Sequence, residues 1–505
     1  MIFLSIFLIL VFKTGNGLLT DGDTGYHIRA GEYIVEHLAV PKQDIFSFLS
    51  PQFRWTVHEW LSEVIMAVIH SAFGLTGVVV FFSFLLALTH FILYKALRAY
   101  SDDIILVTAL TSLATATSSS HWLARPHLFS LMLTLVWYRL LNDYQYKGKN
   151  TLFYLPALML VWVNLHGGFI IGLLLVGIYL GGNLIEWTTE QPSSANPGRE
   201  KAKQLLVIGL LCLATCLVNP QGFKILLFPF EITSNRFLMD NVAEFLSPNF
   251  HQALPFKYML LAAVAIFAIS RIPLNPIELA LLLLMTYMSL YSVRYVSLFA
   301  IMVSYPLLRV SESLVRRLPP RLFTWYQKRN ENLAIMESRM IASLWPALGI
   351  SLVIVLSATG AVRFQFAETV FPVAAVNFIK EEKISGNMFS NDEFGDYIIY
   401  AAWPEYRVFM DGRSDMYGEK VIKEYLKIAR VEPGWEDIIR KHDITTIMFN
   451  TKSALSAALM EHKDWHPIYA DKLATIFIKN DEDHNSLIRR YGNITLPQQR
   501  DGDQE

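Results

Sequence analysis

The stretch Asp21-Gly22-Asp23-Thr24-Gly25 follows the first apolar segment of the chain and precedes a long series of hydrophobic segments. The surrounding residues 18–63 hold an unusual density of ionisable side chains. They are Asp21, Asp23, His27, Arg29, Glu32, His58, Glu59 and Glu63. Two carboxylates one residue apart in a glycine-bearing turn can converge on one hard cation, and His58 and Glu59 can supply further ligands. Because Asp beside Gly is also typical of an Asx turn or a helix cap, both interpretations of the pattern stay open.

Outward from this stretch the chain is strongly apolar. Of its 505 residues, 53% are hydrophobic and 17% are charged, and the mean hydropathy is +0.35. Segments of roughly 20 apolar residues match a bilayer core of about 30 Å, so we expect a polytopic α-helical membrane protein. The net charge of −1 offers no overall attraction to nucleic acid, and we expect no nucleic-acid partner. Cys212 and Cys216 lie within an apolar segment and are interpreted as small buried residues.

Eleven apolar segments are predicted to span the membrane, although several are short or adjoin one another, so hydropathy alone supports ten to twelve. Their approximate ranges are 1–19, 78–97, 104–117, 126–141, 152–165, 169–185, 205–218, 258–269, 276–291, 296–308 and 342–362. The first range also fits the core of a signal peptide. No cleavage site of the Ala-x-Ala type follows it, which favours a span.

The distribution of Lys and Arg gives the expected orientation. With eleven spans and a cytoplasmic N-terminus, the cytoplasmic connections are rich in Lys and Arg. The opposite connections carry the acidic first loop together with Arg125, Asn164, His166, Glu244 and Arg294. Taken singly, an interfacial arginine is usually a snorkelling residue, and His166-Gly167-Gly168 fits a tight helix break. Because polar residues near helix ends tend to face a cavity or one another, their convergence predicts one site on the outer face.

The sequence predicts three regions. Residues 1–362 form a transmembrane domain whose first outer loop, residues 20–75, carries the acidic site. Within that loop Tyr26–Leu38 and Glu59–Phe73 have the spacing of helices lying along the membrane surface. Residues 363–480 alternate amphipathic helical segments with short β-rich runs, so they are expected to form an extracytoplasmic soluble α/β domain. Residues 481–505 are charged, poor in apolar residues and expected to be disordered.

The sharpest feature of the predicted α/β domain is Met410-Asp411-Gly412-Arg413, at the end of a predicted strand, 407–410. Open α/β sheets present functional groups at such strand ends. A turn closed by an interaction between Asp411 and Arg413 explains the same residues. In the tail, Asn493-Ile494-Thr495 fits the glycosylation sequon.

This layout resembles the GT-C superfamily of membrane glycosyltransferases, which take a sugar from a polyprenyl-phosphate carrier. The resemblance covers the architecture of the whole chain. In residues it rests on Asp21-Gly22-Asp23 and His58-Glu59, as in protein O-mannosyltransferases, oligosaccharyltransferases and lipid A aminoarabinose transferases. Four further motifs are similar to those of poorly characterised bacterial membrane proteins grouped with that superfamily. They are Ala124-Arg125-Pro126-His127, Trp162-Val163-Asn164-Leu165-His166-Gly167-Gly168, Asn219-Pro220-Gln221-Gly222 and Met410-Asp411-Gly412-Arg413.

The resemblance implies transfer of a sugar from a polyprenyl-phosphate-linked donor to a lipid, glycan or protein acceptor. The expected place is the outer face of the inner (plasma) membrane, with a role in biosynthesis of cell-envelope polysaccharide. By resemblance Asp23, with Asp21 as the alternate, takes the acceptor's proton, and Glu59 is its partner.

Several further residues are expected to bind the substrate or an ion. Arg125 and Arg294 are expected to stabilise the phosphate of the leaving lipid. Other substrate contacts are expected from His27, His58, Asn164 and His166. A divalent cation, Mg²⁺, Mn²⁺ or Zn²⁺, is expected at Asp21, Asp23 and Glu59. A carboxylate paired with an arginine and no ion explains the same residues.

Two other classes of function are compatible with the sequence. A transporter or flippase for a lipid-linked sugar would place ionisable residues or Gly/Pro breaks midway through the spans and would show paired repeats. The polar groups here lie at the outer ends of the spans instead, and no repeat is visible, which favours the enzyme. The other class is a non-catalytic relative that serves as an assembly factor for surface polysaccharide.

Overall fold

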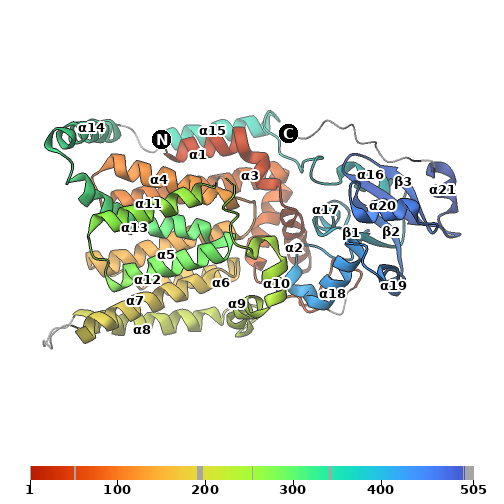
Figure 1. Cartoon of the computed structure of the whole chain (residues 1–505), viewed down its shortest axis with the longest axis horizontal. Coiled ribbons are helices and arrows are strands. Elements are labelled where there is room, and N and C mark those ends of the chain that lie inside the picture. Colours follow the sequence, from red (N-terminus) through yellow and green to blue (C-terminus); the bar gives the residue numbers. More distant parts are fainter. Residues whose placement is uncertain are drawn as a thin grey trace. The chain divides into compact units, whose positions relative to one another are not determined.

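The structure is a computed structural model that describes residues 2–49, 53–189, 197–252, 254–339, 344–492 and 494 (Figure 1). The chain divides into two compact units, which we call the first and the second unit. The first comprises Met1–Gly15 and Thr76–Arg363, and the second comprises Asn16–Leu75 and Phe364–Glu505. The first outer loop, which the sequence assigned to the transmembrane domain, therefore groups with the C-terminal residues.

The first unit is a helix bundle (Figure 1). Its helices are α1 (Ile2–Ile9), η1 (Leu10–Thr14), the later part of α3 (Trp60–Arg98), α4 (Ile104–Ser118), η3 (Ser119–His121), α5 (His127–Lys147), α6 (Tyr154–Leu165), α7 (Phe169–Thr189), α8 (Pro197–Cys216), α9 (Lys224–Ser234), α10 (Arg236–Asn241), η4 (Ala243–Phe245), α11 (Pro255–Ser270), α12 (Pro276–Tyr291), η5 (Val293–Tyr295), α13 (Val296–Val315), α14 (Pro320–Arg339) and α15 (Leu344–Ala358). Helix α13 is the most extensively buried of these and packs against α4, α5, α11 and α12. It forms the centre of the bundle.

Each of the eleven predicted spans overlaps a helix, and the first covers α1, η1 and η2 (Gly15–Leu19), but their number as spans stays a prediction. Among the described residues, four helical segments are long and apolar enough to cross a membrane, or five if α14 and α15 form one bent span. Several others are shorter; α6, for example, has 12 residues, fewer than the roughly 17–25 that a bilayer requires. Helix α14 lies in a connection for which no helix was predicted.

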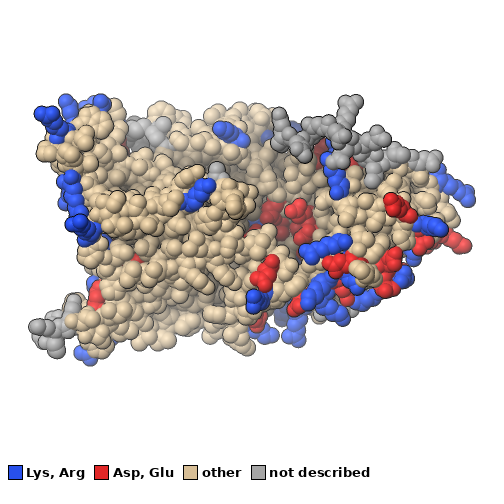
Figure 2. Space-filling view, in the orientation of Figure 1, with Lys and Arg blue, Asp and Glu red and all other residues tan. Residues whose placement is uncertain are grey.

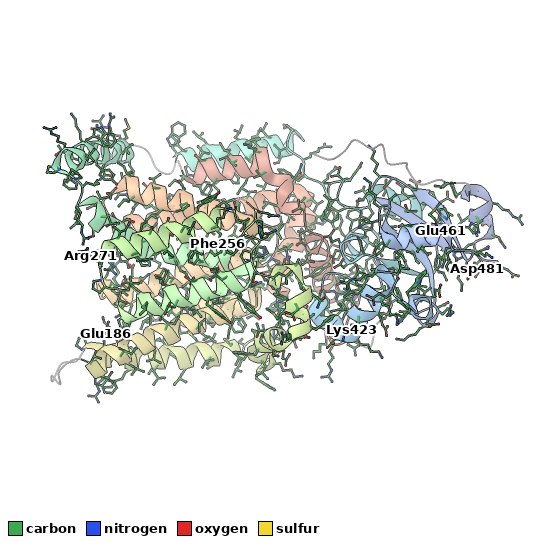
Figure 3. All side chains as sticks on the ribbon, viewed as in Figure 1. Glu186, Phe256, Arg271, Lys423, Glu461 and Asp481 are labelled. Carbon is green, nitrogen blue, oxygen red and sulfur yellow. The ribbon has the colours of Figure 1, made fainter. Side chains whose placement is uncertain are left out.

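The surface of the first unit suits a lipid environment. Large apolar side chains of its outer helices are exposed, among them Leu210, Leu261, Leu283 and Ile354, and extensive exposed apolar surface marks contact with a membrane or a partner. Figure 2 shows mostly uncharged residues along the bundle, with Lys and Arg gathered at the end that carries α14. Figure 3 shows Glu186 and Arg271 at that same end. These features support a membrane protein.

The second unit combines helices with one four-stranded sheet of order β1-β2-β4-β3. Strands β1 (Asn387–Ser390) and β2 (Ile444–Asn450) are parallel, whereas β4 (Ala474–Lys479) is antiparallel to both β2 and β3 (Trp465–Ala470). Its helices are η2 (Gly15–Leu19, starting in the first unit), α2 (Asp23–His37), the start of α3, α16 (Val373–Glu381), α17 (Asp392–Ala402), α18 (Ser414–Ala429), α19 (Trp435–Lys441), α20 (Ala454–Glu461) and α21 (Asn485–Tyr491). Lys423 and Glu461 of this unit are exposed, and both are labelled in Figure 3.

Three details of the second unit differ from the sequence-based expectation. The predicted strand 407–410 is not a strand; Val408 forms single parallel bridges to Ser47 and Met388. Helix α17 was not predicted, although Asn391 caps it by accepting a hydrogen bond from the Phe394 N–H at 2.8 Å. The tail contains α21, while residues 493 and 495–505, including most of the predicted sequon, lie outside the described residues.

Helix α17 packs against α2, which positions the C-terminal residues beside the first loop within one unit. Arg29 of α2 donates to the backbone oxygen of Tyr400 at 2.7 Å, and His70 of α3 lies 3.0 Å from the Tyr400 hydroxyl. These polar contacts join α2, α3 and α17. The acidic loop is therefore held by a helix from the far end of the sequence.

Candidate active site

Asp21 and Asp23 have different structural roles. Asp21 accepts a hydrogen bond from the Asp23 N–H at 2.8 Å, which is the Asx-turn arrangement. Asp23 is the first residue of α2, and its side chain is buried, with 8% of the residue exposed. The Asx turn is therefore present at Asp21, whose role as alternate base or metal ligand stays a prediction. Asp23 is the carboxylate that lies at the start of the helix and is buried within the unit.

Asp396 of α17 lies beside Asp23, and both approach Gly412. The Gly412 N–H donates to Asp396 Oδ1 at 3.0 Å. A Cβ at position 412 would lie 2.2 Å from Asp23 Oδ1 and 3.0 Å from Asp396 Oδ2. A side chain at position 412 would therefore displace the carboxyl of Asp23. Gly412 therefore leaves room for the carboxyl groups of Asp23 and Asp396 beside its own backbone.

The pKa of Asp396 is raised well above its ordinary value. Burial is the main cause, and the nearby carboxylates of Asp23 and Asp411 add to it, whereas the Gly412 N–H opposes it. Two close carboxyl groups in a buried site do not both ionise readily, so one of them retains a proton. Burial and the neighbouring carboxylates therefore favour the neutral form of Asp396.

This raised pKa predicts a pH-dependent effect of Asp396→Asn. A carboxyl whose pKa is higher in the folded than in the unfolded state stabilises the fold most when the pH is below its unfolded pKa of about 3.9. This stabilisation is lost as the pH rises from there to the folded pKa. The loss is about 1.4 kcal/mol for each unit between the two pKa values. Because asparagine mimics the protonated form, the Tm of Asp396→Asn relative to wild type should increase as the pH rises from 4 to 8. The exposed Asp437→Asn is the control, and a pH-independent difference for Asp396→Asn would contradict the assignment.

His27, Glu59 and Glu63 form a second cluster in the same unit. His27 Nδ1 lies 3.1 Å from Glu63 Oε1, and His27 Nε2 lies 3.4 Å from Glu59 Oε2. His58 Nε2 lies 3.5 Å from Glu59 Oε1. Gly31 explains this proximity, because a Cβ there would lie 1.9 Å from the Glu63 carbonyl oxygen. Because Gly31 has no side chain, α2 and α3 can come into contact at this position, one helical turn after His27.

This cluster differs from the predicted metal ligands. Among the described residues, the three side chains whose ligand atoms all lie within 4.8 Å of one another are His27, Glu59 and Glu63. Only Glu59 belongs to the predicted set of Asp21, Asp23 and Glu59. Glu63 was visible in the sequence as an ionisable residue. No sequence pattern indicated that α2 and α3 would place it next to His27.

Arg413 is buried and joins the first loop to the C-terminal residues. Its Nη2 donates to Asp411 Oδ2 at 2.6 Å and to Asp44 Oδ1 at 2.8 Å, and its Nε donates to Asp411 Oδ1 at 2.8 Å. The guanidinium carbon lies 4.4 Å from the ring centroid of Trp55, a cation–π distance. The interaction between Asp411 and Arg413 is therefore present, and Asp44 completes it.

In the first unit, Arg125 and Arg294 share Glu244. Arg125 Nη1 contacts Glu244 Oε1, and Arg294 Nε lies 3.4 Å from Glu244 Oε2. Although burial raises the pKa of Glu244, the two arginines lower it well below its ordinary range. Two guanidinium groups with one carboxylate carry a net positive charge. The structure thus brings the two predicted phosphate-binding arginines together.

Asn164 and His166 belong to a different contact network of the first unit. Asn164 Oδ1 accepts from Asn219 Nδ2 at 3.2 Å, which joins two of the predicted motifs. His166 Nδ1 accepts from the Gly168 N–H at 2.8 Å and lies 2.8 Å from Ser130 Oγ. These contacts hold the helix break after α6. Their predicted contact with substrate stays a prediction.

Asp396, Asp44 and Glu63 are the residues of this neighbourhood to which the sequence assigned no role. The sequence Asn391-Asp392-Glu393 followed by Phe394, Tyr397 and Ile398 has the signature of a helix start and an apolar stripe. This signal could have found α17. No local pattern indicates that Asp396 faces the start of α2.

Known proteins are similar to this chain in structure rather than in sequence. No protein-family model and no curated protein sequence matches this chain. The fold is similar to that of solved archaeal oligosaccharyltransferase structures, which agrees with the resemblance drawn from the sequence. It matches the apo structure of the Archaeoglobus fulgidus oligosaccharyltransferase with a TM-score of 0.54 and 11% identity, over 95% of this chain and 74% of that chain. The oligosaccharyltransferase AglB from Archaeoglobus fulgidus, in complex with an inhibitory peptide and a dolichol-phosphate, gives a TM-score of 0.56 and 11% identity, over 93% of this chain and 72% of that chain.

Proposed function

We propose that this chain is an integral membrane glycosyltransferase. It moves a sugar from a polyprenyl-phosphate-linked donor to a lipid, glycan or protein acceptor at the outer face of the plasma membrane. The observation that supports this most directly is the buried pair of Asp23 and Asp396 at the start of α2 in a chain with the fold of oligosaccharyltransferases. The dolichol-phosphate bound to one of those structures supports a polyprenyl-phosphate carrier.

The reaction requires a base for the acceptor and a stable leaving group. In the proposed step the acceptor oxygen or nitrogen attacks the anomeric carbon and its proton passes to the Asp23 carboxylate. The bond between the anomeric carbon and the phosphate oxygen breaks, and its electron pair leaves with the polyprenyl phosphate. Asp396 lies beside Asp23, and burial raises its pKa, which favours its neutral form. Asp396 is therefore proposed as a positioning residue and Asp23 as the catalytic base.

The negative charge that develops on the leaving phosphate needs a cationic partner. Arg125 and Arg294 are proposed for this role because both contact Glu244, so two guanidinium groups lie at one place. Planar guanidinium groups suit phosphate oxygens, to which they can donate in pairs. His58, His166 and Asn164 are proposed as further contacts to the substrate.

The test is sugar transfer by the purified full-length chain in proteoliposomes. The donor is a membrane lipid extract that contains polyprenyl-phosphate sugars, and mass spectrometry detects both the glycosylated acceptor and the released polyprenyl phosphate. We expect both products from wild type and neither from liposomes with heat-inactivated protein. Movement of intact donor between leaflets without either product would indicate a flippase. Absence of transfer and of movement would indicate an assembly factor, and either outcome overturns the proposal.

A further inference from the structure

We propose that His27, Glu59 and Glu63 bind one divalent transition-metal ion, Zn²⁺ or Mn²⁺, at the contact of α2 and α3. These three residues are distinct from the Asp23 and Asp396 pair that the proposed reaction uses. The inference concerns ion binding and stands without the proposed function.

The spacing of the three side chains fits a small divalent ion. Glu59 and Glu63 are four residues apart at the start of α3, where residues with that spacing share one helix face, and the Glu63 N–H donates to the Glu59 carbonyl oxygen at 3.0 Å. His27 lies opposite, with its ring nitrogens 3.1 Å and 3.4 Å from the two carboxylates. Tetrahedral ligands at about 2.0–2.2 Å from Zn²⁺ lie roughly 3.3–3.6 Å from one another. The two distances above involve different nitrogens of His27, of which one can bind the ion. With one ligand atom taken from each residue, the three atoms all lie within 4.8 Å of one another, so binding would draw them together by about 1 Å to reach this range.

An unsatisfied atom points to a ligand that the protein alone does not supply. Glu63 is 2% exposed, and its Oε2 has no hydrogen-bond partner among the described residues. A buried carboxylate oxygen without a partner costs free energy that a hydrogen bond or a metal would recover. Because Glu63 Oε1 faces His27, the carboxylate is directed into the cluster. A cation at this point would satisfy it.

The balance of buried charge in the second unit supports a cation independently. Besides Asp396, whose pKa is raised, five of its carboxyl side chains are buried, namely Asp23, Asp44, Glu59, Glu63 and Asp411. Among the described residues of this unit, Arg413 is the one buried arginine or lysine, and it is bound to Asp411 and Asp44. Buried charges are normally paired or bound to metals. A divalent ion at His27, Glu59 and Glu63 would offset the excess negative charge.

The ligand types select the class of metal. One imidazole nitrogen and two carboxylates suit Zn²⁺ or Mn²⁺, whereas Mg²⁺ prefers oxygen ligands alone. Three protein ligands would leave a position for water or substrate, as in catalytic zinc sites. When bound, such an ion would supply Lewis acidity at that open position.

The test measures metal retention by the full-length chain in detergent, without any sugar substrate. The protein is stripped with a chelator, incubated with Zn²⁺, Mn²⁺ or Mg²⁺ and desalted, and its metal content is measured by mass spectrometry. Wild type should retain about one Zn²⁺ or Mn²⁺ per chain and little Mg²⁺. Glu63→Gln and His27→Gln should weaken retention by more than the roughly 10- to 100-fold that loss of an outer-shell partner costs.

His70→Gln is the matched control, because His70 also contacts a glutamate, Glu32, at 3.2 Å but has no second carboxylate in a three-ligand group. It should retain the metal as wild type does. Co²⁺ absorption provides a second measurement, since replacing His27 should change the visible spectrum of bound Co²⁺. A thermal unfolding curve establishes that each variant is folded. The proposal is overturned if stripped wild type retains no more Zn²⁺ and Mn²⁺ than folded Glu63→Gln, or if His70→Gln loses as much metal as His27→Gln. Sugar transfer can succeed or fail independently of this result.

Discussion

Asp23→Asn should lower the rate of sugar transfer by roughly 10²- to 10⁴-fold, the usual contribution of a general base, while the chain remains folded. Asparagine has the shape of aspartate but cannot accept the proton of the acceptor. The side chain is buried beside Asp396 and Gly412, so a substitution of equal size is the one that leaves the packing intact. The measurement is the initial rate of product formation in proteoliposomes at equal protein content.

Asp21→Asn is the matched control for this prediction. Asn at position 21 can still accept the Asp23 N–H, as Asp21 does at 2.8 Å, because both residues form Asx turns. Its transfer rate should stay near that of wild type. If Asp23→Asn retains the wild-type rate, Asp23 is not the base. If Asp21→Asn loses as much activity as Asp23→Asn, the role belongs to Asp21 or is shared by both.

Arg413→Met should destabilise the second unit by about 3–5 kcal/mol, the cost of removing one partner from a buried ion pair. Arg413 is 2% exposed, and its loss would leave Asp411 and Asp44 as uncompensated buried carboxylates. Burial by itself disfavours the charged guanidinium, yet these two carboxylates hold the pKa of Arg413 above its ordinary value. The full-length chain in detergent should therefore unfold at a clearly lower temperature than wild type.

Arg440→Met provides the comparison, because Arg440 pairs with Asp437 on the surface, where both side chains are more than half exposed. Such pairs contribute about 0–1 kcal/mol. The triple variant in which Asp411→Asn and Asp44→Asn accompany Arg413→Met should recover part of the lost stability, since no buried charge is left unpaired. Equal unfolding temperatures for Arg413→Met and Arg440→Met would show that the buried network contributes nothing.

Arg413 also explains why the first loop groups with the C-terminal residues. Asp44, Phe46 and Trp55 of the loop surround its guanidinium group, whose carbon lies 4.8 Å and 4.4 Å from the two ring centroids. The Asp-Gly-Arg motif thus has two consequences in this structure. Its arginine binds the loop, and its glycine makes room for the carboxyl of Asp23. A motif that was predicted to present functional groups of a separate C-terminal domain thus supports the site of the first loop, in the same unit.

Local sequence patterns predicted the helices well, because hydropathy and helical spacing are properties of neighbouring residues. The helix 26–38 appears as α2 and the apolar segment 169–185 appears within α7. The incorrect predictions also concerned local structure. Residues 407–410 have β-forming side chains but form single bridges, since the chain turns at Asp411 to bind Arg413. Helix α17 was missed although Asn391-Asp392-Glu393 and the apolar residues after it have the pattern of a helix start.

By itself, the sequence determined an apolar helical chain, the acidic stretch around Asp23 and the resemblance to GT-C enzymes, because composition, periodicity and short motifs need no folding to be visible. Only the tertiary structure decided that Asp396 stands beside Asp23 and that Glu63, rather than Asp21, joins His27 and Glu59. These partners come from separate helices, α17 and α3, which reach α2 through packing and close approach at glycine. Contacts between residues distant in sequence depend on burial and shape complementarity across the whole unit, and no local pattern records them.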